Sequence, residues 1–190
     1  MSEFNKSIVI MGCKHCGKTT HGKALALQKN LPFFDTDEVM QTMNGMPVRN
    51  LYLTRGVSAF MRAEEEACKK IINENSDRQL IISTGGGICD NAPALNILRS
   101  AGLFVFLELD IEYSIQRVYS KIKPNPLGGF QNCPAYVMKE DPKSMNDIYA
   151  ILKKRYEERF ESYRNIADTI IRIRNASVED NFKIISEALR

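Results

Sequence analysis

Short apolar runs alternate with longer helical patterns along most of the chain. Uninterrupted apolar runs are typical of strands buried on both faces of a parallel sheet, and apolar residues recurring every three or four positions are typical of helices that cover such a sheet. Strands are predicted at residues 7–11, 33–34, 80–83, 103–109 and 169–173. Helices are predicted at residues 17–30, 55–75, 91–100, 111–120, 145–166 and 178–189. This alternation predicts an α/β fold with a doubly wound parallel sheet.

One region, residues 121–143, breaks the alternation. Its sequence, KIKPNPLGGFQNCPAYVMKEDPK, contains four prolines and a glycine pair and has no clear period. A loop of this length inside a compact domain is usually functional or disordered. We predict a lid here, and an insertion without function is the alternative.

Composition limits the class of protein. A chain of 190 residues is the size of one domain, and 44% hydrophobic with 26% charged residues excludes disordered, collagen-like and coiled-coil chains. A net charge of +3 is weak for a nucleic-acid binder, and the longest apolar run, residues 101–107, cannot span a bilayer. The first residues, MSEFNK, lack a signal-peptide pattern, and five cysteines are most simply explained as reduced thiols. We expect a cytoplasmic monomer with neither a nucleic-acid nor a membrane partner.

A phosphate-binding motif lies between the first strand and the first helix. Residues 12–19, GCKHCGKT, match G-x-x-x-x-G-K-[ST] in the strand–helix context that its mechanism requires. The glycines let backbone N–H groups face a phosphate chain, and the helix N-terminus adds partial positive charge. Lys18 is expected to reach the β- and γ-phosphates of ATP and Thr19 to ligate Mg²⁺; an ordinary glycine turn is the alternative. The candidate nucleotide-binding residues here are Gly12, Gly17, Lys18, Thr19 and Thr20.

Cys13 and Cys16 fill variable positions of this motif and also form a C-x-x-C pair. No second C-x-x-C and no paired histidine follows, so a metal site is disfavoured. Packing is the preferred interpretation, with redox sensitivity of the pair as an alternative.

Two acids, Asp35 and Asp37, follow the strand at residues 33–34. One can hold Mg²⁺ through water, and the other can bind or deprotonate an attacking hydroxyl. The alternative is a helix N-cap with acidic residues in the first turn.

Three consecutive glycines, Gly85, Gly86 and Gly87, follow the strand at residues 80–83. Such a run costs chain entropy and is explained where the backbone must approach a ligand closely. A plain loop is the alternative.

Glu64 and Arg159 each interrupt the apolar stripe of a predicted helix. A charge on a burying face normally needs a partner, so we infer that the two are neighbours or that both line a polar cleft. Snorkelling at the edge of each stripe is the alternative. Arg174 and Asn175 close the last strand, where ligands of doubly wound sheets gather, and are candidates to meet a nucleotide base. Arg117, late in the helix after the fourth strand, is a further candidate to contact the nucleotide base.

At this point the residues resemble those of the shikimate kinases, relatives of the nucleoside monophosphate kinases, over residues 7–190. The resemblance is carried by GCKHCGKT, then LPFFDTD, the G-x-x-x-F segment at residues 56–60 with Glu64, and ISTGGG. It continues through a proline-bearing lid around Pro124 and Pro126 and ends with RFESYRNIAD at residues 159–168. The phosphate loop is shared by many NTPases, whereas FFDTD and STGGG in this order are much more specific.

The resemblance implies a three-layer α/β/α P-loop NTPase fold with a five-stranded parallel sheet. A single domain, residues 1–190, would include a substrate-binding region at about 35–75 and a lid at about 121–143. Asp35 would share the Mg²⁺ shell with Thr19, and Asp37 would bind the acceptor and help deprotonate its attacking hydroxyl. The other roles that it implies are substrate contacts from Gly85, Gly86 and Gly87, a carboxylate contact from Arg159, site walls from Tyr52 and Phe60, and adenine contacts from Arg117 and Arg174.

Two arginines of the family pattern are replaced. The family pattern G-E-x-x-F-R corresponds to residues 56–61, GVSAFM, in this chain, so Met61 stands in place of the arginine. The family pattern R-P-L corresponds to Asn125-Pro126-Leu127. Arg62 lies about 100° further around the helix and cannot simply substitute for the arginine lost at Met61. No arginine occurs between Arg117 and Arg155, so the lid offers only lysines to the transferring phosphoryl group: Lys121, Lys123, Lys139 and Lys143.

The sequence therefore predicts an ATP- and Mg²⁺-dependent kinase of a small hydroxyl compound, with shikimate as the expected acceptor and shikimate 3-phosphate as the product. Two alternatives stay open. One is a paralogous kinase with a different hydroxyl acceptor, which the altered arginines favour. The other is a non-catalytic nucleotide-binding regulator, against which Asp37 and the triple glycine argue.

Overall fold

The computed structural model describes residues 6–126 and 128–190. Residues 1–5, where a signal peptide would begin, and Leu127 of the lid lie outside the described residues. Five parallel strands form one sheet in the order β2-β3-β1-β4-β7. The strands are β1 (Ser7–Met11), β2 (Phe33–Asp35), β3 (Ile81–Ser83), β4 (Gly102–Leu109) and β7 (Thr169–Ile173). The five-stranded parallel sheet is confirmed, and each strand lies where the apolar runs predict it.

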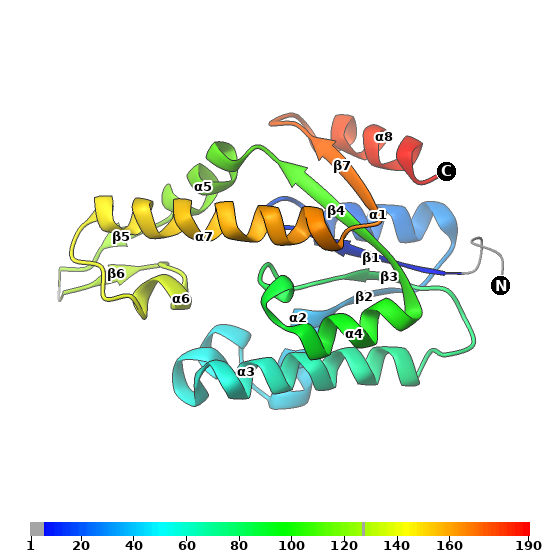
Figure 1. The fold of residues 1–190 in the computed structure, drawn as a ribbon, viewed down its shortest axis with the longest axis horizontal. Coiled ribbons are helices and arrows are strands. Elements are labelled where there is room, and N and C mark those ends of the chain that lie inside the picture. The colour runs from blue at the N-terminus through cyan, green and yellow to red at the C-terminus, as the bar shows by residue number, and fades with distance from the viewer. Residues whose placement is uncertain (1–5, 127) are drawn as a thin grey trace.

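Helices cover both faces of the sheet (Figure 1). Alternate strand residues separate the two cores: Ile10 and Val105 pack with α1 (Lys18–Lys29) and α8 (Val178–Ala188), and Val9 and Phe104 pack with the other layer. That layer consists of α3 (Val48–Asn73), α4 (Ala92–Ala101), α5 (Ile111–Tyr119) and α7 (Met145–Ile166). The three-layer α/β/α architecture is therefore confirmed, and burial on both faces explains why the strands read as continuous apolar runs.

The region predicted to bind substrate, residues 35–75, contains more helix than the single one predicted at residues 55–75. An unpredicted helix, α2 (Thr36–Asn44), precedes α3, which begins at Val48 and is kinked at Gly56, where φ is 80° and ψ is 177°. Glycine adopts this positive φ readily, so the break needs no compensating contact. Met40, Leu51 and Ala67 form a small core of their own between the two helices.

The region predicted as a lid contains short elements. β5 (Lys123–Pro124) and β6 (Phe130–Gln131) pair antiparallel, and α6 (Ala135–Met138) follows. Figure 1 places them at the end of the molecule where α7 begins. Cys133 and Val137 are fully buried against the main core, so this part of the predicted lid is packed down over the domain.

Among the described residues, no helix combines the length and apolar character needed to cross a membrane.

Candidate active site

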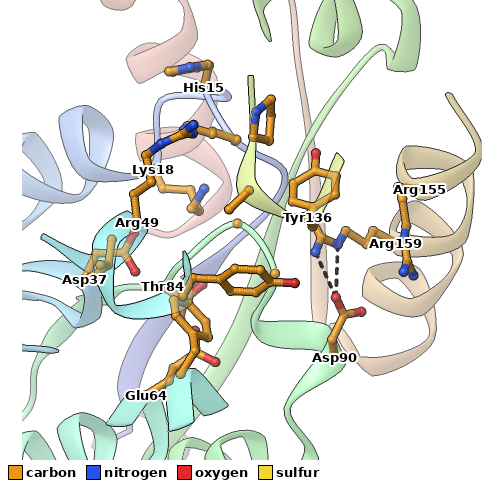
Figure 2. A pocket seen from close by; sticks show the side chains of 18 of the residues that line it. His15, Lys18, Asp37, Arg49, Glu64, Thr84, Asp90, Tyr136, Arg155 and Arg159 are labelled. Atoms are coloured by element: carbon orange, nitrogen blue, oxygen red, sulfur yellow. Dashed lines mark hydrogen bonds and ion pairs between the residues drawn. The ribbon is translucent and has the colours of Figure 1, made fainter. Parts of the chain in front are cut away.

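A cleft of about 1380 Å³ opens where the strands end. Its walls include residues that follow the carboxyl ends of β1, β2 and β3, together with side chains from α3, α6 and α7 (Figure 2). Ligands of doubly wound sheets gather at this edge. The predicted site residues that line the cleft are Gly17, Lys18, Thr19, Thr20, Asp35, Asp37, Tyr52, Phe60, Met61, Gly86, Gly87, Arg117 and Arg159.

The phosphate loop has the backbone that its glycines allow. Gly12 and Gly17 have φ values of 147° and 91°, and a Cβ on Gly12 would lie 2.9 Å from the carbonyl oxygen of Leu107. Lys18, only 7% exposed, donates from Nζ to the carbonyl of Cys13 at 3.0 Å. The ammonium is therefore held over the loop at the N-terminus of α1, where anions bind.

The two predicted metal ligands are in contact. Thr19 Oγ1 donates to Asp35 Oδ2 at 2.7 Å, and the hydroxyl of Ser83 lies 3.5 Å from that of Thr19. Asp35 Oδ1 accepts from the backbone N–H of Asp37 at 3.0 Å, so Asp35 is also the N-cap of α2. The N-cap interpretation of this carboxylate is confirmed, and its second oxygen faces Thr19, while a role for Asp35 in holding Mg²⁺ stays a prediction. Oxygen donors with one carboxylate, completed by phosphate oxygens and water, suit Mg²⁺.

Asp37 lies deep in the cleft beside the triple glycine. Burial, reinforced by the nearby Asp35 carboxylate, raises the pKa of Asp37, while Lys18 and Lys14 act in the opposite direction. A carboxylate with a raised pKa accepts a proton more readily, as a general base requires.

Each of the three glycines faces a functional group. A Cβ on Gly85 would lie 2.9 Å from Asp37 Oδ1, one on Gly86 would lie 2.9 Å from the backbone N of Lys14, and one on Gly87 would lie 2.8 Å from Arg159 Nη2. A larger residue at Gly86 would meet backbone, and one at Gly85 or Gly87 would displace a charged side chain of the site. The glycine run is explained by close approach between groups of the site, while its contact with substrate stays a prediction.

Arg159 is held by its surroundings. Its Nη2 and Nε donate to Asp90 Oδ2 at 2.8 and 3.2 Å, and its guanidinium lies 4.8 Å from the ring centroid of Tyr136 in the lid. Figure 2 shows this pairing across the cleft. Arg159 is thus fixed in orientation by Asp90, which belongs to a short 3₁₀ turn (Ile88–Asp90) after the glycine run.

Glu64 is 1% exposed and is bound by Asn91 rather than by Arg159. Asn91 Nδ2 donates at 2.9 Å both to Glu64 Oε2 and to the carbonyl of Met61. No hydrogen bond or ion pair joins Glu64 to Arg159 within residues 6–126 and 128–190, so a direct pairing is wrong. The 3₁₀ turn and the residue after it supply a separate partner for each. Both side chains nevertheless line the same cleft, as the other half of the inference requires.

The buried carboxyl of Glu64 should make stability depend on pH. Burial raises its pKa from 4.5 to about 7, with Asp37 and Asp90 adding to the rise and Asn91 and Arg159 opposing it. A folded-state pKa above the unfolded value means that stability is complete below about pH 4.5 and falls as the pH rises toward 7. Glu64→Gln removes this ionisation, so we expect it to raise stability at pH 8 by on the order of 3 kcal/mol, or about 6–12 °C in melting temperature.

At pH 5 the same substitution should change the melting temperature little, because the carboxyl is then mostly protonated in the folded protein. Thermal melts at both pH values measure the effect. Glu66→Gln, at an exposed position half a turn away on α3, is the control. Equal shifts at the two pH values would show that Glu64 is not the titrating group.

Tyr52, Phe60 and Met61 form the wall contributed by α3. The rings of Tyr52 and Phe60 meet edge to face, with centroids 5.5 Å apart. All three side chains line the cleft, as predicted.

The predicted adenine contacts are only partly at the cleft. Arg117 lines it and donates to the carbonyl of His15 at 2.9 Å and to Asn175 Oδ1 at 3.2 Å. Arg174 and Asn175 are not among its lining residues, and Asn175 reaches it only through Arg117. The backbone of Arg174 is instead paired with the side chain of Asn181. Contact of Arg117 and Arg174 with adenine stays a prediction.

Cys13 and Cys16 pack into opposite cores of the sheet. Both thiols are buried, and burial raises the pKa of Cys13. No cluster of three or more metal-ligating side chains occurs in the part of the chain that the structure describes. The packing interpretation therefore accounts for the pair.

Several residues that line the cleft were missed. Asp90 and Asn91 follow the triple glycine and precede Ala-Pro, a helix-start signal that could have been recognised. Lys14 and His15 fill variable positions of the phosphate loop, and Arg49, Tyr136 and Arg155 carry no local motif and are brought in by packing.

The fold and the site define a P-loop phosphotransferase with the topology of the nucleoside monophosphate kinases. A family model described as shikimate kinase matches residues 14–190. A shikimate kinase of Francisella tularensis subsp. holarctica is 30% identical over 184 residues, covering 97% of this chain and 94% of the relative. One of Bartonella henselae is 30% identical over 168 residues, covering 88% and 78%.

Solved structures give the same result. The shikimate kinase of Aquifex aeolicus superimposes with a TM-score of 0.70 at 26% identity, covering 96% of this chain and 95% of that one. The shikimate kinase of Acinetobacter baumannii in complex with shikimate has a TM-score of 0.74 at 23% identity, covering 98% and 94%, which supports the fold. The chain belongs to the shikimate kinase family.

Proposed function

We propose that this protein transfers the γ-phosphoryl group of ATP to a hydroxyl of shikimate, forming shikimate 3-phosphate. One observation carries the proposal most directly: the partly buried carboxylate of Asp37 lies in the cleft between the phosphate loop and the glycine run. A base placed there can reach an acceptor hydroxyl on one side while Lys18 contacts the phosphates on the other.

The chemistry follows from this placement. Asp37 accepts the proton of the acceptor hydroxyl as that oxygen bonds to the γ-phosphorus, and the bond from phosphorus to the bridging oxygen of ADP breaks. Lys18 neutralises charge on the phosphates, and Thr19 with Asp35 would hold Mg²⁺. When bound, Mg²⁺ supplies further charge neutralisation. The lid segment around Cys133 and Val137, packed against the core, limits the access of water, which would otherwise compete as acceptor.

Arg159 is the group best placed to bind the carboxylate of shikimate. Its guanidinium is fixed by Asp90 and lies against Gly87, so backbone and cation can meet an acceptor together. A carboxylate bound by a preoriented guanidinium gains charge-assisted hydrogen bonds. This arrangement favours an anionic acceptor over a neutral one.

A coupled assay of ADP release tests the function, with Mg·ATP and a panel of shikimate, other hydroxy acids, sugars and nucleosides. We expect turnover with shikimate and little with neutral alcohols. Preferential turnover of another compound would identify a paralogous kinase, and ATP binding without turnover of any acceptor would identify a nucleotide-dependent regulator.

Met61→Arg tests how the acceptor is recognised. A hydrogen bond to a charged group contributes roughly 1.5–3 kcal/mol, so the restored guanidinium should lower the KM for shikimate by about 10- to 150-fold. Steady-state kinetics with shikimate in both proteins measures this. Met61→Leu, which keeps the position apolar, is the control. A low KM in the unmodified protein, unchanged by Met61→Arg, would show that another cation already holds the carboxylate.

We also propose a cytoplasmic monomer. The support is that all five cysteines are free, four of them buried, as expected in a reducing compartment. Light scattering at assay concentration tests the monomer.

A further inference from the structure

Arg49, on the first turn of α3, is a cation of the cleft to which no local motif points. Its side chain is exposed to the cleft, and its Nη1 donates to the carbonyl oxygen of Cys133 in the lid. Figure 2 shows Arg49 in the same part of the cleft as Lys18 and Asp37. One side chain therefore joins the substrate-binding region, the lid and the neighbourhood of the phosphate loop.

The surroundings of Arg49 are strongly positive. Lys14 has its pKa lowered by burial and next by Arg49, with Lys121 and Lys18 acting in the same direction and Asp37 opposing them. The pKa of His15 is lowered to about 4 by burial together with the positive charges of Lys121, Lys14 and Lys18. Like charges gathered beside the Asp37 carboxylate repel one another, and a bound anion would relieve that repulsion.

The lid in this chain contributes no arginine, since none occurs between Arg117 and Arg155. At the point where the lid meets α3 it contributes a backbone carbonyl instead, that of Cys133, and Arg49 is the donor to it. A guanidinium has five N–H donors, so a bond to one carbonyl leaves donors for phosphoryl oxygens. Cys133 is fully buried, so its carbonyl is a fixed anchor.

We propose that Arg49 is a catalytic residue whose guanidinium binds the transferring phosphoryl group, supplying from α3 the guanidinium that the lid, which has only lysines, does not contribute. The carbonyl of Cys133 orients the guanidinium and ties its position to that of the lid. The inference rests on the proposed function and assigns one further group to the same site.

The test compares the binding of Mg·ADP with that of Mg²⁺ and a non-hydrolysable ATP analogue. Only the analogue carries a γ-phosphoryl group. By calorimetry, Arg49→Ala should weaken the analogue by about 10- to 150-fold and leave ADP within about twofold, as expected for the loss of charge-assisted hydrogen bonds. Arg49→Lys should recover part of the loss. Arg55→Ala, an exposed position on α3 outside the cleft lining, should behave as the unmodified protein.

Turnover provides a second measurement. Added guanidinium ion should restore part of the kcat lost in Arg49→Ala and should not affect Arg55→Ala. Equal effects of Arg49→Ala on ADP and analogue, or a change confined to the KM for the acceptor, would overturn the proposal. The binding measurement needs no acceptor, so it tests this inference separately from the proposed function. If Arg49→Ala weakens binding of the analogue but not of ADP, and the unmodified protein does not phosphorylate shikimate, only the proposed acceptor is contradicted.

Discussion

Lys18→Ala is expected to lower kcat by at least about a thousandfold while the fold persists. The ammonium is buried at the N-terminus of α1, where it can neutralise charge that develops between the β- and γ-phosphates. Removing one preorganised group of this kind from a transition state typically costs 10²–10³, and removing a cation from a phosphoryl-transfer site costs more.

The loss of Lys18 should affect stability much less than activity. The substitution leaves the carbonyl of Cys13 without one donor, which costs on the order of 1 kcal/mol. Steady-state kinetics and a thermal melt of the same sample separate the two effects. Lys23→Ala, on the solvent side of the same helix, removes a surface ion pair with Glu38 and serves as the control. Normal turnover by a folded Lys18→Ala protein would contradict the assignment of the phosphate loop.

The central sheet could be predicted because its strands are buried on both faces. Val9 and Ile10 enter opposite cores, so consecutive positions in the middle of the strand are apolar. The start of α3 could not be read in the same way. Residues 48–54 pack on a small core with Met40 and are separated from the rest of the helix by the break at Gly56, so no continuous helical stripe runs through them.

The site residues could be predicted where reactive side chains directly follow or end a predicted strand in the sequence. Thr19 lies in the first turn of α1 after β1, Asp35 ends β2, and their side chains do meet, as the resemblance implies. The partners of Glu64 and Arg159 were not predictable, because Asp90 and Asn91 reach them only through the 3₁₀ turn after the glycine run. Arg49 was missed for the same reason: its place depends on how the lid packs.

Asp37→Asn should reduce kcat by about 10²–10⁴-fold, the range for loss of a positioned general base. The amide keeps the size and much of the hydrogen bonding of the carboxylate but cannot accept the acceptor's proton. The raised pKa of Asp37 also predicts the pH profile of the unmodified protein. Activity requires the deprotonated carboxylate, so kcat/KM should fall as the pH drops through a pKa above 3.8, and this acid limb should disappear in the variant.

Stability should move in the opposite direction from activity. Burial and Asp35 raise the pKa of Asp37, so the ionised carboxylate costs the folded protein stability at neutral pH, and Asp37→Asn removes that cost. We therefore expect a variant that melts no lower than the unmodified protein at pH 7 and is nearly inactive, which excludes unfolding as the cause. Glu38→Gln, the exposed neighbour on α2, controls for the loss of one negative charge near the phosphates. If kcat stays within about tenfold while the KM for the acceptor rises, Asp37 binds the acceptor hydroxyls and another group takes the proton.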